Sequence, residues 1–218
     1  MTETNHEPGE NRPRRKAVRI AGEVLSQLLN VPILSGALLT FLFFKLPTNI
    51  PQRLAGFGWA LLFISLIPLG SLFFYIPGKL RDWPRVIKRQ RIASFVFMIV
   101  SYPIGFLVLR LTGAPRVYEA IAVTYTLVTL GLIVFNLGLR YKASGHAAGV
   151  AGPVAALIYI FGLIAAPLIA LIPLTGVARI MAKGHNMWQT VAGALLSLAT
   201  TALVLWAYGF MPLSGVLH

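Results

Sequence analysis

Long stretches without a charged side chain constrain this sequence more than any other feature. Each supplies about 20 apolar residues or slightly fewer, the length that crosses a hydrocarbon core of about 30 Å. The chain as a whole is 57% hydrophobic and has a mean hydropathy of +0.77, too apolar for a domain whose surface must face water. The sequence therefore predicts an integral, multi-pass membrane protein. The uncharged stretches cover residues 31–44, 54–78, 92–109, 120–139, 143–178 and 184–218.

The lengths of these stretches predict an all-α bundle of six to seven transmembrane helices. We expect helices near residues 30–46, 54–77, 92–110, 118–139 and 189–210. The stretch 143–178 is too long for one ordinary crossing, because a straight helix of that length would extend about 54 Å at about 1.5 Å per residue. We expect it to fold back on itself at residues 162–167 (GLIAAP), where glycine and proline break a helix.

The distribution of charged residues predicts which loops share a side of the membrane with the N-terminal tail. Residues 1–18 are polar and basic and are expected to form a disordered tail, followed by one transmembrane domain over residues 19–218. With seven crossings, the tail and the loops at 78–91, 140–146 and 179–188 share one side. That side holds all but four of the 19 basic residues, the exceptions being Lys45, Arg53, Arg110 and Arg116. The positive-inside rule then places these loops in the cytoplasm of a cell-membrane protein, and explains the net charge of +13 without a nucleic-acid partner.

Acidic residues are too few for several kinds of membrane enzyme. Only Asp82 and Glu119 follow the N-terminal region, and the chain has no cysteine. The chain therefore has no cluster of aspartates to hold Mg²⁺ and no thiol chemistry, and a carboxylate pair is not expected because Asp82 and Glu119 lie in separate loops. We expect no metal and no cofactor, and the residue types left for chemistry are Arg, Lys, His and Ser.

Three polar stretches interrupt the apolar pattern, at residues 82–91 (DWPRVIKRQR), 142–146 (KASGH) and 179–189 (RIMAKGHNMWQ). They supply cations, Lys142 among them, together with a Ser-Gly pair at a helix start, where free N–H groups favour a phosphate. Two histidines at such a site permit phosphoryl transfer without a metal. Gln189 lies four residues after His185, where its amide oxygen would accept a ring N–H of that histidine.

At these stretches the sequence resembles the type 2 phosphatidic acid phosphatase superfamily. ASGHA at 143–147 is similar to the family motif Pro-Ser-Gly-His, and Arg179-x5-His185-x3-Gln189 is similar to Ser-Arg-x5-His-x3-Asp. The family's first motif, Lys-x6-Arg-Pro, is matched more weakly by Asp82, Lys88 and Arg91. The likeness covers about residues 82–200.

The resemblance implies a role for each matching residue. His185 would be the nucleophile that attacks phosphorus, His146 the general acid, and Gln189 the residue that orients the nucleophile. The expected phosphate cradle consists of Lys88, Arg91, Ser144, Gly145 and Arg179. The chain departs from the family pattern through a helical hairpin over 143–178 and at four positions, Ile92, Ala143, Ala178 and Gln189.

These features predict a metal-independent phosphatase of membrane lipids that works through a phosphohistidine intermediate. Polyprenyl phosphates or diphosphates are the first expected substrates, and phosphatidic acid or phosphatidylglycerol phosphate the second. Two alternatives stay open: a non-catalytic structural or lipid-binding subunit of a larger membrane complex, favoured by the four departures, and an anion transporter.

Overall fold

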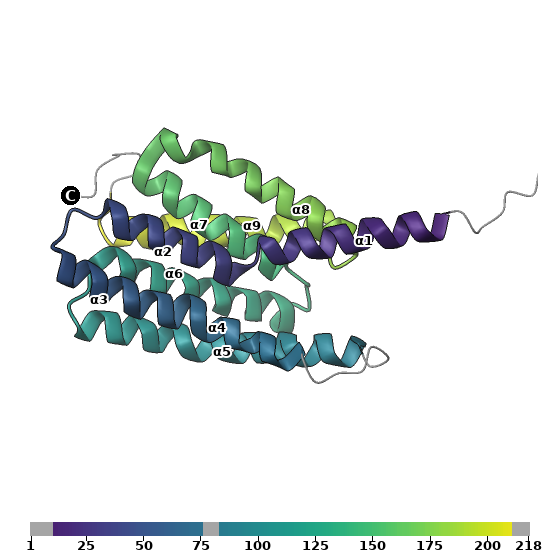
Figure 1. Cartoon of the computed structure of the whole chain (residues 1–218), viewed down its shortest axis with the longest axis horizontal. Coiled ribbons are helices and arrows are strands. Elements are labelled where there is room, and N and C mark those ends of the chain that lie inside the picture. The colour runs from purple at the N-terminus through teal and green to yellow at the C-terminus, as the bar shows by residue number, and fades with distance from the viewer. Residues whose placement is uncertain (1–10, 76–82, 211–218) are drawn as a thin grey trace, which may run out of the picture.

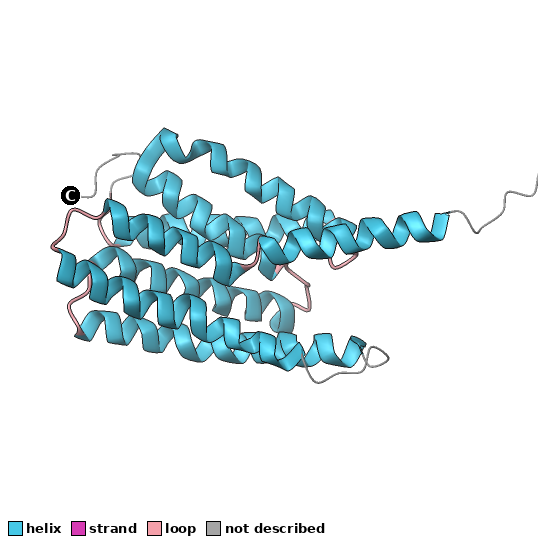
Figure 2. Cartoon of the chain, viewed as in Figure 1, coloured by secondary structure: helices cyan, strands magenta, loops and turns pink. Residues whose placement is uncertain are grey.

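The computed structural model describes residues 11–75 and 83–210, and within these ranges the side chains of residues 11–16, 72, 74–75, 83–88 and 90–91 lie outside the description. The regular elements of the described residues are all helical, and successive helices run back and forth along one direction (Figures 1 and 2). The elements are α1 (Asn11–Leu28), α2 (Val31–Lys45), α3 (Ile50–Ala60), the π-helical η1 (Leu61–Leu66), α4 (Ile67–Leu69), the 3-10 helix η2 (Gly70–Tyr75), α5 (Trp83–Leu111), α6 (Arg116–Ile133), the π-helical η4 (Val134–Gly138), α7 (Gly145–Phe161), the 3-10 helix η5 (Gly162–Ala170), α8 (Leu171–Met181) and α9 (Met187–Ala207).

Six helical stretches are long and apolar enough to cross a membrane, which confirms the predicted all-α, multi-pass bundle. They are Ala17–Lys45, Ile50–Leu69, Ile92–Leu111, Arg116–Gly138, Gly145–Met181 and Met187–Ala207. Large apolar side chains such as Leu107, Leu163 and Trp206 point outward. A bundle with this surface lies in lipid, where outward apolar side chains carry no penalty.

The predicted hairpin at residues 162–167 is confirmed. Helix α7 ends at Phe161, and Gly162 has a φ of +69°, a left-handed conformation that favours glycine. The chain then turns through η5, and α8 packs back along α7 (Figure 1). The hairpin divides one of the six apolar stretches, Gly145–Met181, into two arms that pack side by side.

The predicted disordered tail is wrong for residues 11–18, which belong to helix α1, whereas residues 1–10 lie outside the described residues. Pro13 lies in the first turn of α1, where proline is tolerated, and the residues after it are good helix formers. The C-terminal half of α1 packs on α8, and Gly22 allows the two helices to approach closely. A Cβ atom there would lie 2.9 Å from the carbonyl oxygen of Ala178.

The loops gather at two opposite ends of the bundle. The α1–α2 junction and the loops before α7 and α9 lie together at the end from which α1 extends, on the right in Figure 1. The loops after α2 and α5 lie at the other end with the η5 turn. All the predicted polar loops that the structure describes therefore meet at one end.

Candidate active site

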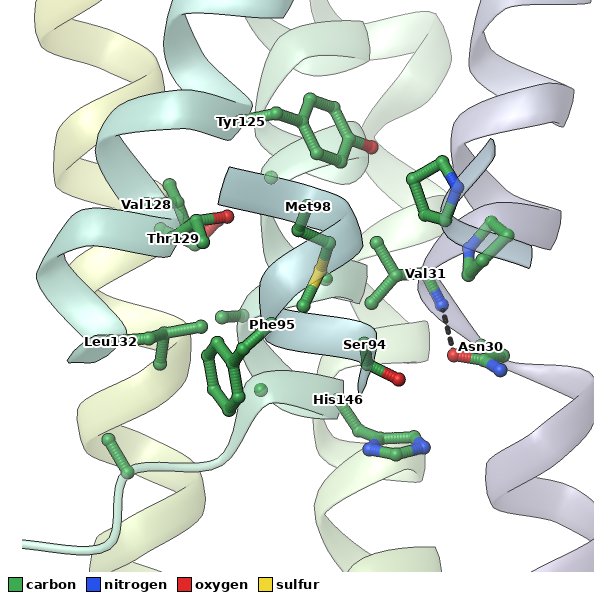
Figure 3. Close-up of a pocket in the computed structure, with 18 of the residues that line it drawn as sticks. Asn30, Val31, Ser94, Phe95, Met98, Tyr125, Val128, Thr129, Leu132 and His146 are labelled. Carbon is green, nitrogen blue, oxygen red and sulfur yellow. Dashed lines mark hydrogen bonds between the residues drawn. The ribbon is translucent and has the colours of Figure 1, made fainter. Parts of the chain in front are cut away.

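A cavity of about 210 Å³ opens among the helices at the end where the polar loops meet. In Figure 3, His146 lies at one end of the labelled side chains and Tyr125 at the other, with Phe95 and Met98 between them. The lining is polar near the loops and mostly apolar deeper in the bundle. Its polar side chains near the loops are Gln27, Asn30, Ser94, Asn136, Lys142, His146, Arg179 and His185.

The structure brings together both predicted histidines and the predicted arginine. His146, Arg179 and His185 line this one cavity, as does Gly145. Nε2 of His146 and Nδ1 of His185 are buried. Two imidazole rings and a guanidinium group thus share one small space, although they come from segments far apart in the sequence.

His146 is positioned by the start of helix α7. Ser144 is the N-cap residue, and its Oγ accepts the N–H of Ala147 at 3.3 Å. The N–H of Ser144 donates to the carbonyl oxygen of Gln189 at 2.9 Å, which ties the start of α7 to α9. Gly193 permits this approach, because a Cβ atom there would overlap the backbone of Ser144. These contacts hold His146, in the first turn of α7, against the cavity.

His185 is positioned by the turn that ends helix α8. The carbonyl oxygen of Arg179 accepts the N–H of Gly184 at 3.0 Å and that of His185 at 3.4 Å. The guanidinium group of Arg179 lies against Gly184, where a Cβ atom would overlap it. Lys142 Nζ donates to the carbonyl oxygen of Gly184 at 2.9 Å, so the loop before α7 is fastened to the loop that carries His185.

Arg179 is held from the other side by helix α1. The side chain is buried, with 8% of its surface exposed, and its Nη1 donates to Oγ of Ser26 at 3.0 Å. Ser26 is itself fully buried. A buried guanidinium group requires hydrogen-bond acceptors around it, so α1 contributes directly to the position of this cation.

Two of the predicted site residues serve as helix caps instead of lining the cavity. Ser144 is fully buried beneath the α7 start and uses its oxygen for Ala147. Gln189 forms a capping box with Asn186: its Oε1 accepts the N–H of Asn186 at 3.1 Å, and its N–H donates to Asn186 Oδ1 at 2.9 Å. The amide oxygen that the sequence assigns to the ring of His185 is thus directed to the start of α9.

The first predicted motif falls mostly outside the described residues. This holds for Asp82 and for the side chains of Lys88 and Arg91. The backbone of α5 places Arg91 one helical turn before Ser94 and Phe95, which line the cavity.

Asn136, Ser94, Asn30 and Gln27 line the cavity without having been predicted. Asn136 was detectable, because it is the one amide side chain in the uncharged stretch 120–139, and polar groups inside membrane helices often mark functional sites. It donates to the carbonyl oxygen of Leu132 at 2.7 Å. Gln27 and Asn30 lie at the α1–α2 junction, just before the first uncharged stretch of the sequence.

The donor set suits an anion better than a metal ion. Among the described residues, no three His, Asp or Glu side chains are close enough to bind one metal ion together. Arginine and lysine donors instead match the oxygens of a phosphate group. No known protein family, curated protein or solved structure matches this chain.

Proposed function

We propose that this protein is a metal-independent phosphatase of membrane lipids, similar in mechanism to the type 2 phosphatidic acid phosphatases. The observation that carries the proposal is the meeting of His146, His185 and Arg179 in one cavity. They lie at the polar end of a space whose remaining walls are mostly apolar, which suits a phosphate group attached to a hydrocarbon chain.

The proposed reaction has two steps and uses both histidines. A ring nitrogen of His185 attacks phosphorus, and the phosphorus–oxygen bond to the lipid breaks as His146 gives its proton to the departing oxygen. Water then attacks the phosphohistidine and loses a proton to His146, so that inorganic phosphate leaves and both rings return to their first state. Arg179 offsets the negative charge on the phosphate in both steps.

A lipid with a single chain, such as a polyprenyl phosphate or diphosphate, is the first substrate that we propose, and phosphatidic acid or phosphatidylglycerol phosphate is the second. One turn after His146, Gly149 of α7 lies directly against Val31 of α2, which leaves little room between the two helices there. A single chain beside the phosphate fits such a space more easily than a glycerol carrying two acyl chains.

We also propose that the site faces the cytoplasm, since most basic residues lie at its end of the bundle. Tyr141 offers a test, because it is exposed in the loop before α7 and the chain has no cysteine. A Tyr141→Cys variant is expected to resist a membrane-impermeant thiol reagent in intact cells and to react after lysis. Strong labelling in intact cells would place the site on the outer side.

The enzyme proposal is tested by phosphate release from a polyprenyl monophosphate by the purified protein in the presence of EDTA. His185→Ala is expected to lower the rate at least about a thousandfold, as removal of a nucleophile does. His146→Ala is expected to lower it by about a hundredfold or more, the typical contribution of a general acid. His6→Ala is the matched control, since His6 precedes the described helices. Phosphate release by this variant should stay within twofold of the wild-type rate.

A second candidate is a membrane subunit that binds lipid phosphates without hydrolysing them. It is favoured by the use of Ser144 and Gln189 as helix caps, which directs the amide oxygen of Gln189 to the N–H of Asn186. Equal and negligible phosphate release by wild type and His185→Ala, together with saturable binding of the polyprenyl phosphate, would establish this second function instead of the first.

A further inference from the structure

The size of the cavity raises the question of where the chain of a lipid phosphate would lie. The cavity measures about 210 Å³, whereas pockets that enclose a drug-sized ligand occupy about 300–1,000 Å³. A phosphate group and the first carbons of a chain fit inside it, but a long hydrocarbon chain does not. If the proposed function is correct, most of the chain must therefore leave the cavity through one of its walls.

The exposed lining residues identify that wall. Leu69 of α4 lines the cavity and is 36% exposed. Two further lining residues lie at the α1–α2 junction, where Gln27 is exposed and Val31 is half-buried. Apolar side chains that face both the cavity and the outside are expected where a lipid chain passes between helices.

The helices on the two sides of this wall diverge. Oγ of Ser65 donates to the carbonyl oxygen of Pro32 at 2.5 Å, which fastens η1 to the start of α2. Beyond that bond the two sides pack on different partners: α1 packs on α8, and η2 packs on α5, where Ser94 donates to Ser71 at 2.9 Å. Figure 1 shows α1 and the α4–α5 pair separating toward this end of the bundle.

We infer that the lipid chain passes from the cavity into the bilayer through a lateral opening between the α1–α2 junction and helix α4, with Val31 and Leu69 on its two sides. This inference rests on the proposed function. The opening lets a lipid enter sideways while its phosphate reaches His146 and His185, and it sets no upper limit on chain length. A short, water-soluble phosphate ester does not need the opening, because it can enter from the polar end.

The absence of cysteine from the chain allows a reversible test. A Leu69→Cys variant is modified with a benzyl methanethiosulfonate reagent, which adds an aromatic group at the opening and is removed by dithiothreitol. The matched control is Leu66→Cys, which lies one turn earlier on the outer surface, is 51% exposed and does not line the cavity. The substrates are a polyprenyl monophosphate and butyl phosphate.

Modification at position 69 is expected to lower kcat/KM for the polyprenyl phosphate at least tenfold, and this value should recover after reduction. The kcat/KM for butyl phosphate should stay within twofold of the value for the unmodified variant. Modification at position 66 should change neither. An unchanged polyprenyl rate after complete modification at position 69, verified by mass spectrometry, would overturn the inference. An equal fall for both substrates would overturn it as well, because the added group would then act on the site itself.

A binding experiment separates this inference from the proposed function. If the wild-type protein hydrolyses neither substrate, the proposed enzyme function fails, but the path of the chain can still be measured. An alkyl phosphate with a diazirine at the middle of its chain is bound to wild-type protein and irradiated. Crosslinks to the peptides that contain Leu69 and Val31 are expected, whereas crosslinks confined to Tyr125 at the deep end of the cavity would refute the lateral opening.

Discussion

Replacement of Ser26 by alanine is expected to weaken the active site from outside the predicted motifs. Ser26 lies on α1, and its Oγ accepts a hydrogen bond from Arg179 Nη1 at 3.0 Å while both side chains are buried. A hydrogen bond to a charged group contributes about 1.5–3 kcal/mol. At about 1.36 kcal/mol per factor of ten, Ser26→Ala should lower kcat/KM for a lipid phosphate by roughly 10- to 150-fold if the whole contribution acts through the position of Arg179.

The assay is phosphate release by purified variants, combined with a double-mutant cycle. Thr201→Val is the control, because Thr201 is also fully buried and its hydroxyl donates to the Ser197 carbonyl oxygen of its own helix, at 2.7 Å. Its kcat/KM should stay within twofold even if its melting temperature falls. In an Arg179→Lys background, Ser26→Ala should cost little further activity, since the two residues act as a unit. Independent, multiplying losses would refute the coupling between Ser26 and Arg179.

Two glycines give further predictions. Gly184→Ala should move the guanidinium group of Arg179, which lies against this position, and lower kcat/KM about tenfold with little change in thermal stability, because the displaced atoms end a flexible side chain. A fall in melting temperature without a loss of activity would contradict this reasoning. Gly193→Ala should instead destabilise the protein by about 1–3 kcal/mol, because the new methyl group meets the rigid backbone of Ser144. Gly58→Ala is its control, with no atom within 4 Å of the new methyl group, and equal melting temperatures for the two variants would refute the packing argument.

The fold could be predicted because lipid imposes a simple rule on the sequence. A helix that crosses a bilayer must carry about 20 apolar residues, and charge between such stretches marks the loops. The stretch 143–178 also revealed the hairpin, since it was too long for one crossing and contained a glycine where α7 ends. These signals are local, so they can be read without knowing which helices become neighbours.

Helix α1 could not be predicted in the same way. Its first half is basic and contains Pro13, which is typical of a polar tail. Its helical structure is supported by α8, against which Gly22 and Ser26 lie, four residues apart and therefore on one face. The sequence shows the two small residues but gives no indication of their partner.

Helix caps explain why the site was predicted only in part. Serine at a helix start suits a phosphate because free N–H groups point outward there, but the same N–H groups can donate to a side-chain oxygen of the chain itself. Ser144 and Gln189 both take this local role, at the starts of α7 and α9. Both histidines line the cavity, whereas the polar side chains of Ser144 and Gln189 are used at the helix starts.

The surroundings of Arg179 bear on one of the four departures from the motifs that the sequence resembles. The family pattern places a serine immediately before the arginine, and this chain has Ala178 there. Helix α1 passes directly over Ala178, with Gly22 against its carbonyl oxygen, and one turn further on Ser26 brings a hydroxyl to Arg179. If Ser26 positions Arg179 as proposed, a departure in the motif is offset by a helix that lies more than 150 residues away in the sequence. The departure at Ala178 is then weaker evidence against catalysis than the departure at Gln189, whose oxygen the fold directs elsewhere.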